Sequence, residues 1–277
     1  MKINNNEVSK FFFTSDSKDI FLTETAYLAD IVLPASAFPE KTGTFTNTDR
    51  RVQLAKKAVN PPGEAKQDWW IIQELAKRFD LGWSYSGPDE IYDELRNCME
   101  SIKNISWERL VKEGAVTYPC DAEDKPGNEV IFGEGFPTNN KKGRLVPAKL
   151  IDPDEKPDKD FPFVLTTGRL LEHWHTGSMT MRAKILNSIE PEPYVHISKN
   201  DMKNNNLTQN DTIELQTRRG KITVKVRKDR MIPDGLVFMP FCFEKAPVNL
   251  LTNQALDPDG KIPELKYCAA KISKINV

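Results

Sequence analysis

Apolar residues recur at helical spacing between residues 65 and 113. The stretch AKQDWWIIQELAKRF has Asp68 near its start and a basic pair near its end, which predicts a helix. We expect Trp69 and Trp70 to pack in a core. The predicted inward face comprises Trp69, Ile72, Leu75, Ala76 and Phe79. Pro88 is suited to begin a second helix that extends to Met99, and a third is predicted from Trp107 to Glu113.

Strand patterns dominate the chain beyond residue 160. The apolar run Phe161–Leu165 predicts a strand that breaks into a polar turn at Thr166–Arg169. The stretch TIELQTRRGKITVKVRKD alternates almost perfectly and predicts a hairpin that turns at Arg219-Gly220. Further strands are predicted in YVHIS, where His196 is read as an ordinary strand residue, in LVFMPFCF and in YCAAKISKINV, with a helix from Ala183 to Ile189. Several short strands with tight turns favour a small β-barrel.

The first sixty residues mix short strands with polar turns. Phe11–Phe13 and Ile31–Leu33 predict strands, the second of them buried and stopped by Pro34. A strand so close to the start of the chain suggests the last part of a larger α/β unit. The stretch EKTGTFTNTDRRVQ, residues 40–53, predicts a solvated surface loop with short polar groups and an adjacent Arg50-Arg51 pair.

Residues 118–160 are irregular, with several Gly and Pro residues and many charges. Within them DPDEKPDKD, from Asp152 to Asp160, has the composition of a linker. We therefore expect two domains, residues 1–157 with a partial α/β (Rossmann-like) fold and residues 158–277 with a β-barrel.

Composition narrows the classes of function. The 277 residues include 39 Lys plus Arg and 40 Asp plus Glu, so no global field attracts nucleic acid or an anionic membrane. No apolar run is long enough to span a bilayer and no signal peptide is evident, which predicts a cytosolic protein. The four cysteines are scattered without C-x-x-C spacing, so we expect buried structural thiols and neither a zinc site nor an iron–sulfur cluster within this chain.

The candidate chemistry gathers in FPFVLTTGRLLEHWHTGSMTMR, residues 161–182. Two of the chain's three histidines, His173 and His175, follow Gly168 and Arg169. Glycine lets backbone N–H groups approach an anion, arginine binds it through two hydrogen bonds, and hydroxyls fill the remaining acceptor sites. The pattern is compatible with a phosphate-bearing or nucleotide cofactor. An ordinary turn with partly buried packing histidines is the alternative.

Three long motifs carry a resemblance to a known family. TETAYLADIVLPASAFPEKTGTFTNTDRRVQ resembles the third-domain signature of the molybdopterin-dinucleotide oxidoreductases. LTTGRLLEHWHTGSMTMR and NLLTNQALDPDGKIPELKYCAAKI resemble their C-terminal dinucleotide-binding domain. The sequences of the three motifs are most similar to those of formate dehydrogenase large (alpha) subunits. Residues 85–155 contribute little to the resemblance. The resemblance implies a double-psi β-barrel that covers a bis(molybdopterin guanine dinucleotide) cofactor with Mo or W.

The resemblance also implies the residues that contact the cofactor. His173 and His175 would reach the pterin or its phosphates, Phe241 would take the place of a Tyr found in some relatives, and Asn47 would approach from the α/β domain. The full implied set is Thr167, Gly168, Arg169, Leu170, His173, His175, Ser178, Met179, Phe241, Asn249, Lys266 and Asn47. Arg, Lys and amide groups suit a diphosphate and the polar edge of a pterin.

The family's cysteine-rich iron–sulfur segment and its metal-ligating Cys or selenocysteine have no counterpart in this sequence. We therefore expect no catalytic residue and no metal ligand here, and read the chain as the last third of a large subunit whose N-terminal portion carries a 4Fe-4S cluster. That portion is a separate partner chain or was lost by truncation. An incomplete α/β domain would leave Ile31–Leu33 at an uncovered surface.

The implied reaction is oxidation of formate to carbon dioxide, with electrons passing through iron–sulfur clusters to NAD and through partner subunits. The chain alone would be inactive. Two alternatives stay open, a non-catalytic cofactor-binding or assembly module, and another oxidoreductase of the superfamily such as a nitrate reductase.

Overall fold

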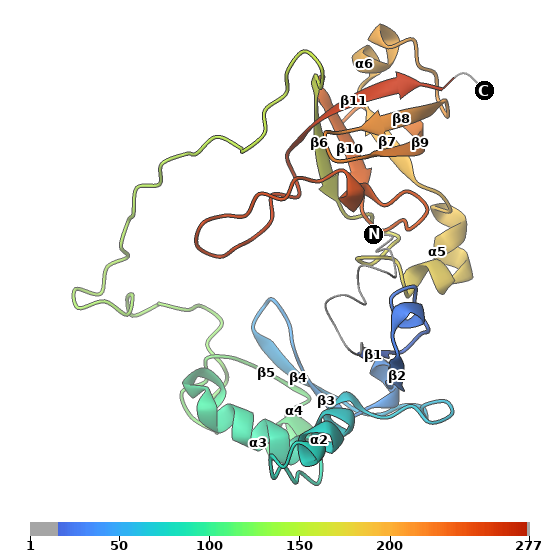
Figure 1. Cartoon of the computed structure of the whole chain (residues 1–277). Coiled ribbons are helices and arrows are strands. Elements are labelled where there is room, and N and C mark those ends of the chain that lie inside the picture. Colours follow the sequence, from blue (N-terminus) through green and yellow to red (C-terminus); the bar gives the residue numbers. More distant parts are fainter. Residues whose placement is uncertain (1–15, 276–277) are drawn as a thin grey trace. The chain divides into compact units, whose positions relative to one another are not determined.

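The computed structural model describes residues 16–275, which form two compact units, residues 16–147 (the N-terminal unit) and residues 148–275 (the barrel unit) (Figure 1). Each unit has its own hydrophobic core. The strand expected at Phe11–Phe13 lies outside the described residues.

The N-terminal unit contains two small sheets. Strands β1 (Asp16–Asp19) and β2 (Ile31–Pro34) are parallel, whereas β3 (Gly43–Thr46), β4 (Arg51–Ala55) and β5 (Ala115–Thr117) form an antiparallel sheet in that order. The predicted loop at residues 40–53 is therefore wrong, because its two polar flanks pair as a hairpin. One parallel pair is not the sheet of a Rossmann-like domain, so that part of the fold prediction is not confirmed.

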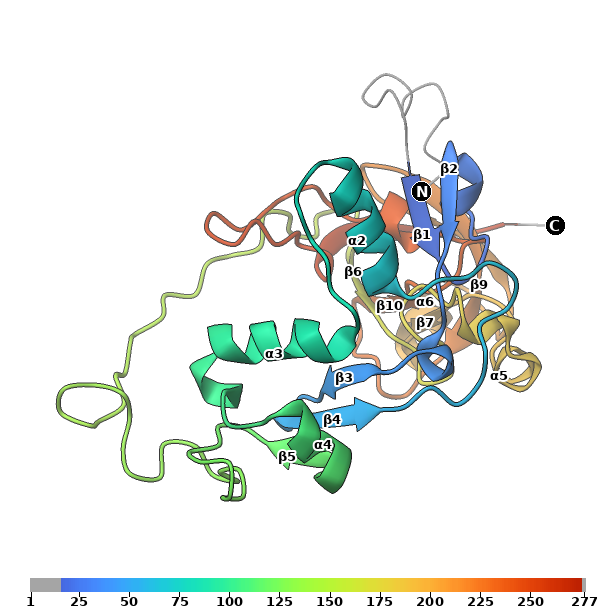
Figure 2. The same cartoon turned by 90° about the horizontal axis from the view of Figure 1, so that it is seen from below.

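Helices cover the antiparallel sheet of this unit. The three helices predicted between residues 65 and 113 are all confirmed: α2 (Asp68–Arg78), α3 (Pro88–Cys98) and α4 (Trp107–Glu113). Short 3₁₀ turns lie at η1 (Ala26–Leu28), η2 (Phe38–Glu40) and η3 (Glu100–Ile102). Figure 2 shows α3 and α4 beside β3–β5. Their buried core comprises Val52, Tyr92, Ile102, Ile105, Leu110, Val116 and Cys120.

Helix α2 and strand β2 differ from the sequence prediction in what they bury. Ile71 and Ala76 are buried on α2, whereas Ile72 is 48% and Phe79 is 75% exposed, so most of the predicted inward face is open. Trp70 is also exposed. On β2, Ile31 is 50% exposed, which contradicts the expected burial and agrees with the uncovered surface expected of an incomplete α/β domain.

Six strands close into a barrel in the second unit (Figure 1). Their order around the barrel is β10-β6-β11-β8-β9-β7; β10 is parallel to β6 and β7 to β9, and the other four pairs are antiparallel. The strands are β6 (Phe163–Gly168), β7 (Tyr194–Ile197), β8 (Thr212–Gln216), β9 (Lys221–Lys228), β10 (Leu236–Pro240) and β11 (Cys268–Lys274). The connections carry η4 (Thr180–Arg182), α5 (Lys184–Ile189), α6 (Lys199–Asn204) and η5 (Val248–Leu250). The predicted barrel is confirmed.

Alternating buried and exposed positions let these strands enclose a core. Every second residue of β6 and β8 is buried, which places Leu165, Ile213 and Leu215 at 0% exposure. Strand β6 extends through Thr166–Gly168, because those residues pair with the end of β10. The predicted break after Leu165 is therefore wrong.

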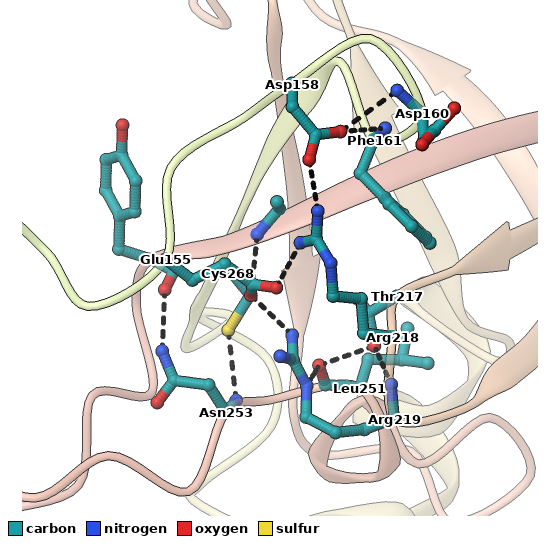
Figure 3. Close-up of polar contacts among 12 residues, drawn as sticks. Glu155, Asp158, Asp160, Phe161, Thr217, Arg218, Arg219, Leu251, Asn253 and Cys268 are labelled. Carbon is teal, nitrogen blue, oxygen red and sulfur yellow. Dashed lines mark hydrogen bonds and ion pairs between the residues drawn. The ribbon is translucent and has the colours of Figure 1, made fainter.

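Part of the predicted linker belongs to the barrel unit. Glu155 and Asp158 form ion pairs with Arg218, and Glu155 also pairs with Arg219 in the β8–β9 turn (Figure 3). The composition of this stretch indicated a free spacer. In the structure, the Glu155 and Asp158 carboxylates instead form ion pairs with the barrel.

Candidate functional site

Three strand ends meet at one end of the barrel. Gly168 and Pro240 are partners at the ends of the parallel strands β6 and β10, and the Phe241 backbone N–H donates to the Gly168 carbonyl at 3.2 Å. Strand β11 runs antiparallel to β6 and therefore begins at this end, where the Thr167 hydroxyl donates to the Leu265 carbonyl at 2.8 Å. The topology thus brings together three segments that are far apart in the sequence.

Arg169 and His175 lie beside this junction. Arg169 is exposed, and its Nη2 is 3.4 Å from Nε2 of His175. The His175 ring is edge-on to Phe241, with 6.5 Å between ring centroids. His175 has φ +48°, an uncommon conformation for a residue other than glycine or asparagine. The backbone turn after β6 thus folds His175 back toward Arg169 and Phe241, so these three predicted residues converge.

His173 has a different environment from His175. Its side chain is 1% exposed, and the Phe243 ring packs edge-on against it. Nε2 is 2.7 Å from the Glu190 carbonyl, which requires a donor, and Nδ1 is 3.3 Å from the Thr180 hydroxyl. Both ring nitrogens are therefore used within the chain, which agrees with the packing alternative for this histidine.

Packing against β10 by itself accounts for a glycine at position 168. A Cβ added there would lie 2.6 Å from Cε2 of Phe238 on β10, well inside carbon–carbon contact distance. Gly177 has φ +74°, so the loop that carries Ser178 and Met179 requires a residue free of a side chain at that point. Ser178 is half-buried and Met179 is 50% exposed.

Two further predicted residues, Asn249 and Lys266, share this end of the barrel. The β8–β9 turn lies here because β8 runs antiparallel to β11, and a Cβ added to Gly220 in that turn would be 3.0 Å from the Leu250 carbonyl. The 3₁₀ turn that carries Asn249 therefore rests on the hairpin. Lys266 follows Leu265, which the Thr167 hydroxyl holds. Both side chains are exposed.

The remaining predicted residues are not part of that convergence. Leu170 is half-buried directly after Arg169. Asn47 belongs to the N-terminal unit, where it is exposed in the β3–β4 turn and its N–H donates to the Arg51 carbonyl at 3.0 Å. Arg50, predicted as half of a surface basic pair, instead donates to the carbonyls of Tyr118, Asn128 and Glu129.

The cysteines follow the expectation of buried thiols with one exception. Cys120, Cys242 and Cys268 are buried, whereas Cys98 is exposed. Burial raises the pKa of the Cys242 thiol to about 11, and burial also raises the pKa of Cys268. Within residues 16–275, no group of three or more His, Cys, Asp or Glu side chains is arranged to hold a metal ion. None of the helices in that range is long and apolar enough to cross a bilayer.

Comparisons with known proteins match two separate parts of the chain. Residues 163–269 match the molydopterin dinucleotide binding domain, and residues 5–78 match the molybdopterin oxidoreductase model. Acetylene hydratase from Pelobacter acetylenicus has the same fold over 94% of this chain and 40% of its own, with a TM-score of 0.73 at 22% identity. The two matching models are both molybdopterin models, and each matches a separate part of the chain.

Its curated relatives include formate dehydrogenase subunits. The F420-dependent formate dehydrogenase subunit alpha of Methanocaldococcus jannaschii is 47% identical over 260 residues, which are 93% of this chain. The assimilatory nitrate reductase catalytic subunit of Bacillus subtilis is 36% identical over 266 residues. This chain spans 38% of the length of both relatives.

Proposed function

We propose that this chain is the C-terminal, cofactor-binding part of a formate dehydrogenase large subunit. The observation that carries the proposal is the convergence of Gly168, Arg169, His175 and Phe241 at one barrel end, in a chain whose two matching family models are both molybdopterin models. In this proposal residues 158–277 form a double-psi barrel and residues 1–157 are part of an α/β, Rossmann-like domain.

The residues at the barrel end fit a pterin dinucleotide. Arg169 and Lys266 supply exposed cations for a diphosphate, and Asn249 supplies an exposed amide for the pterin edge. We assign His175 and Phe241 to flank the ligand, and Thr167 to hold the Lys266 loop through the Leu265 carbonyl. The backbone of Gly168 and Leu170 and the side chains of Ser178 and Met179 complete the contact surface. The buried His173 positions this loop through Glu190 and Thr180.

In the whole protein the reaction is the oxidation of formate to carbon dioxide, a proton and two electrons. The bound bis(molybdopterin guanine dinucleotide), with Mo or W, supplies the two-electron chemistry. The chain described here binds and orients it and contributes no catalytic residue. The remainder of the large subunit, or a separate chain, supplies the metal ligand and a 4Fe-4S cluster, so this chain alone is inactive.

Further subunits carry the electrons to an acceptor in the cytosol. NAD is the acceptor that the resemblance of the motifs implies. The relative from Methanocaldococcus jannaschii is named as F420-dependent, which makes F420 the competing assignment. Formate-dependent reduction of each acceptor by the purified assembly decides between them.

A nitrate reductase is the second candidate function, because the Bacillus subtilis relative is 36% identical and matches 93% of this chain. Barrel residues that hold a common cofactor do not select the substrate. Nitrate-dependent oxidation of a reduced dye by the assembly, with no formate-dependent activity, would favour this candidate. A cofactor-free chain without partners would favour a non-catalytic module.

The test is co-purification of the tagged chain from its native host. We expect molybdenum or tungsten, pterin fluorescence after oxidation, and a cysteine-rich partner protein in one eluate. Arg169→Ala should lower the pterin content several-fold, because it removes the cation at the strand junction. Arg230→Ala is the matched control, since Arg230 is exposed in the loop before β10, at the opposite barrel end. Equal pterin content in both variants would refute the assigned site.

A further inference from the structure

We infer that Glu155 is a positioning residue that holds the two loops carrying Asn249 and Lys266. This inference rests on the proposed function for its link to the cofactor, whereas its structural part stands on contacts alone. Glu155 lies in the irregular stretch before β6 and was predicted to be part of a linker. Its side chain is only 12% exposed.

The Glu155 carboxylate accepts hydrogen bonds from three donors in the barrel (Figure 3). Arg218 donates to Oε1, while Arg219 Nη2 at 2.7 Å and the Ala269 backbone N–H at 3.1 Å donate to Oε2. Burial raises the pKa of this carboxyl, and the bonds from Arg219, Arg218 and Ala269 outweigh burial, so the net pKa is lowered. The carboxylate thus ties the β8–β9 turn to the start of β11.

From Arg219 the network continues into the first loop, residues 247–255. Arg219 Nε donates to the Leu251 carbonyl at 3.2 Å, and the buried Thr217 hydroxyl donates to the same oxygen at 2.9 Å. The Thr252 hydroxyl in turn donates to the Asn249 carbonyl at 3.1 Å. Asn249 therefore lies two residues from the Leu251 carbonyl, which the Arg219 and Thr217 side chains both hold.

Asn253 extends the network to the second loop, residues 264–267. Its N–H donates to Cys268 Sγ at 3.2 Å, and its Nδ2 donates to the Glu264 carboxylate at 2.6 Å and the Tyr267 carbonyl at 3.2 Å. These last two contacts lie on either side of Lys266. Because Glu155 binds Ala269 at the other end of the same segment, the start of β11 is held from both sides.

Val248 and Leu251 anchor the first loop in the barrel core, so the bonds from Arg219 and Thr217 add to this apolar packing. The network borders a solvent-open depression of about 480 Å³, whose lining includes Glu155, Lys156, the two arginines and Asn253. Asp158 binds Arg218, and Arg218 stacks on Phe161 at 4.6 Å, so the stretch itself has a second attachment. Glu155 differs from Asp158 because its carboxylate binds both Arg219 and the backbone of β11. Replacing the Glu155 carboxylate by an amide removes its charge and turns one of its two acceptor atoms into a donor, which faces either the exposed Arg218 or the half-buried Arg219.

The test compares Glu155→Gln with Asp154→Asn in the full chain. Asp154 is the exposed carboxylate next to Glu155, so its variant makes the same charge change without touching the network. We expect amide hydrogen exchange in residues 249–255 and 264–267 to quicken at least about tenfold in Glu155→Gln, with β8 and β9 unchanged. Arg219→Lys should quicken the same residues, since lysine cannot reach both Leu251 and Glu155. Asp154→Asn should change neither loop.

Pterin content, measured on the same preparations, separates the two proposals. We expect it to fall in Glu155→Gln and Arg219→Lys and to stay constant in Asp154→Asn. Unchanged exchange in the two loops, or faster exchange throughout the barrel, would overturn the positioning role. A wild-type chain without pterin would overturn the proposed function instead, while the localised exchange change would still support the loop-holding network.

Discussion

Replacing Gly168 by alanine tests whether the end of β6 is fixed by steric fit to β10. The new Cβ would lie 2.6 Å from Cε2 and 3.1 Å from Cζ of Phe238. Attractive carbon–carbon contact begins at about 3.5 Å, so the ring must move by about 1 Å. Phe238 is half-buried and its ring also packs edge-on against His196, with 5.5 Å between centroids, which limits the space for that movement.

The expected magnitude follows from two opposing effects. Overpacking of this kind typically costs about 1–3 kcal/mol. Alanine also restricts the unfolded chain, which stabilises the protein by about 0.4–1 kcal/mol where the backbone permits it. Gly168 lies in a regular strand, so the second effect applies. We expect Gly168→Ala to lower the free energy of unfolding of the barrel unit by about 1.3 kcal/mol, the difference between the midpoints of the two ranges.

Thiol labelling along a urea titration can measure this change in the barrel unit alone. Cys242 and Cys268 are buried and belong to that unit, so each reacts only when the barrel opens. The exposed Cys98 serves as an internal standard for reagent activity. Mass spectrometry of the labelled peptides separates the three thiols.

The decisive comparison is the same substitution in a Phe238→Ala background. Without the ring the overlap disappears, so Gly168→Ala should there stabilise the barrel by about 0.4–1 kcal/mol. The sign of the effect thus reverses between the two backgrounds. An equal loss of stability in both would refute the steric reasoning.

Three other predictions concern separate parts of the molecule. Leu165→Ala should lower the free energy of unfolding of the barrel by about 2–5 kcal/mol in the same labelling assay, because Leu165 is fully buried in the core. Arg50→Ala should speed proteolysis at residues 118–129, whose carbonyls Arg50 binds, whereas Arg51→Ala, with an exposed side chain, should not. For Cys242 the folded pKa of about 11 exceeds the ordinary value of 9.0, so the unfolded state loses its proton first. Barrel stability measured by urea unfolding should therefore decline from about pH 9 to pH 11, and a Cys242→Ala variant should show a smaller decline.

The local sequence pattern was sufficient to predict those helices and strands whose formation depends on their own residues. The helices near residues 68, 88 and 107 follow from spacing, charged residues at helix ends and proline position, and the β8–β9 hairpin follows from alternation around Arg219-Gly220. Which face of α2 is buried did not follow, because Trp70, Ile72 and Phe79 are as apolar as the residues that the unit covers. Burial depends on what lies opposite, and helical periodicity carries no information about that neighbour.

The candidate site divides in the same way. The sequence predicted a cofactor site from the residue types around Gly168, Arg169 and the histidines. The three motifs predicted the family. Only the barrel topology placed Phe241 and Lys266 beside them, separated His173 from His175, and gave Glu155 its partners. Residue chemistry is a local property that the sequence states directly. Convergence depends on strand direction and register over about a hundred residues of separation, and only the closed barrel decides those.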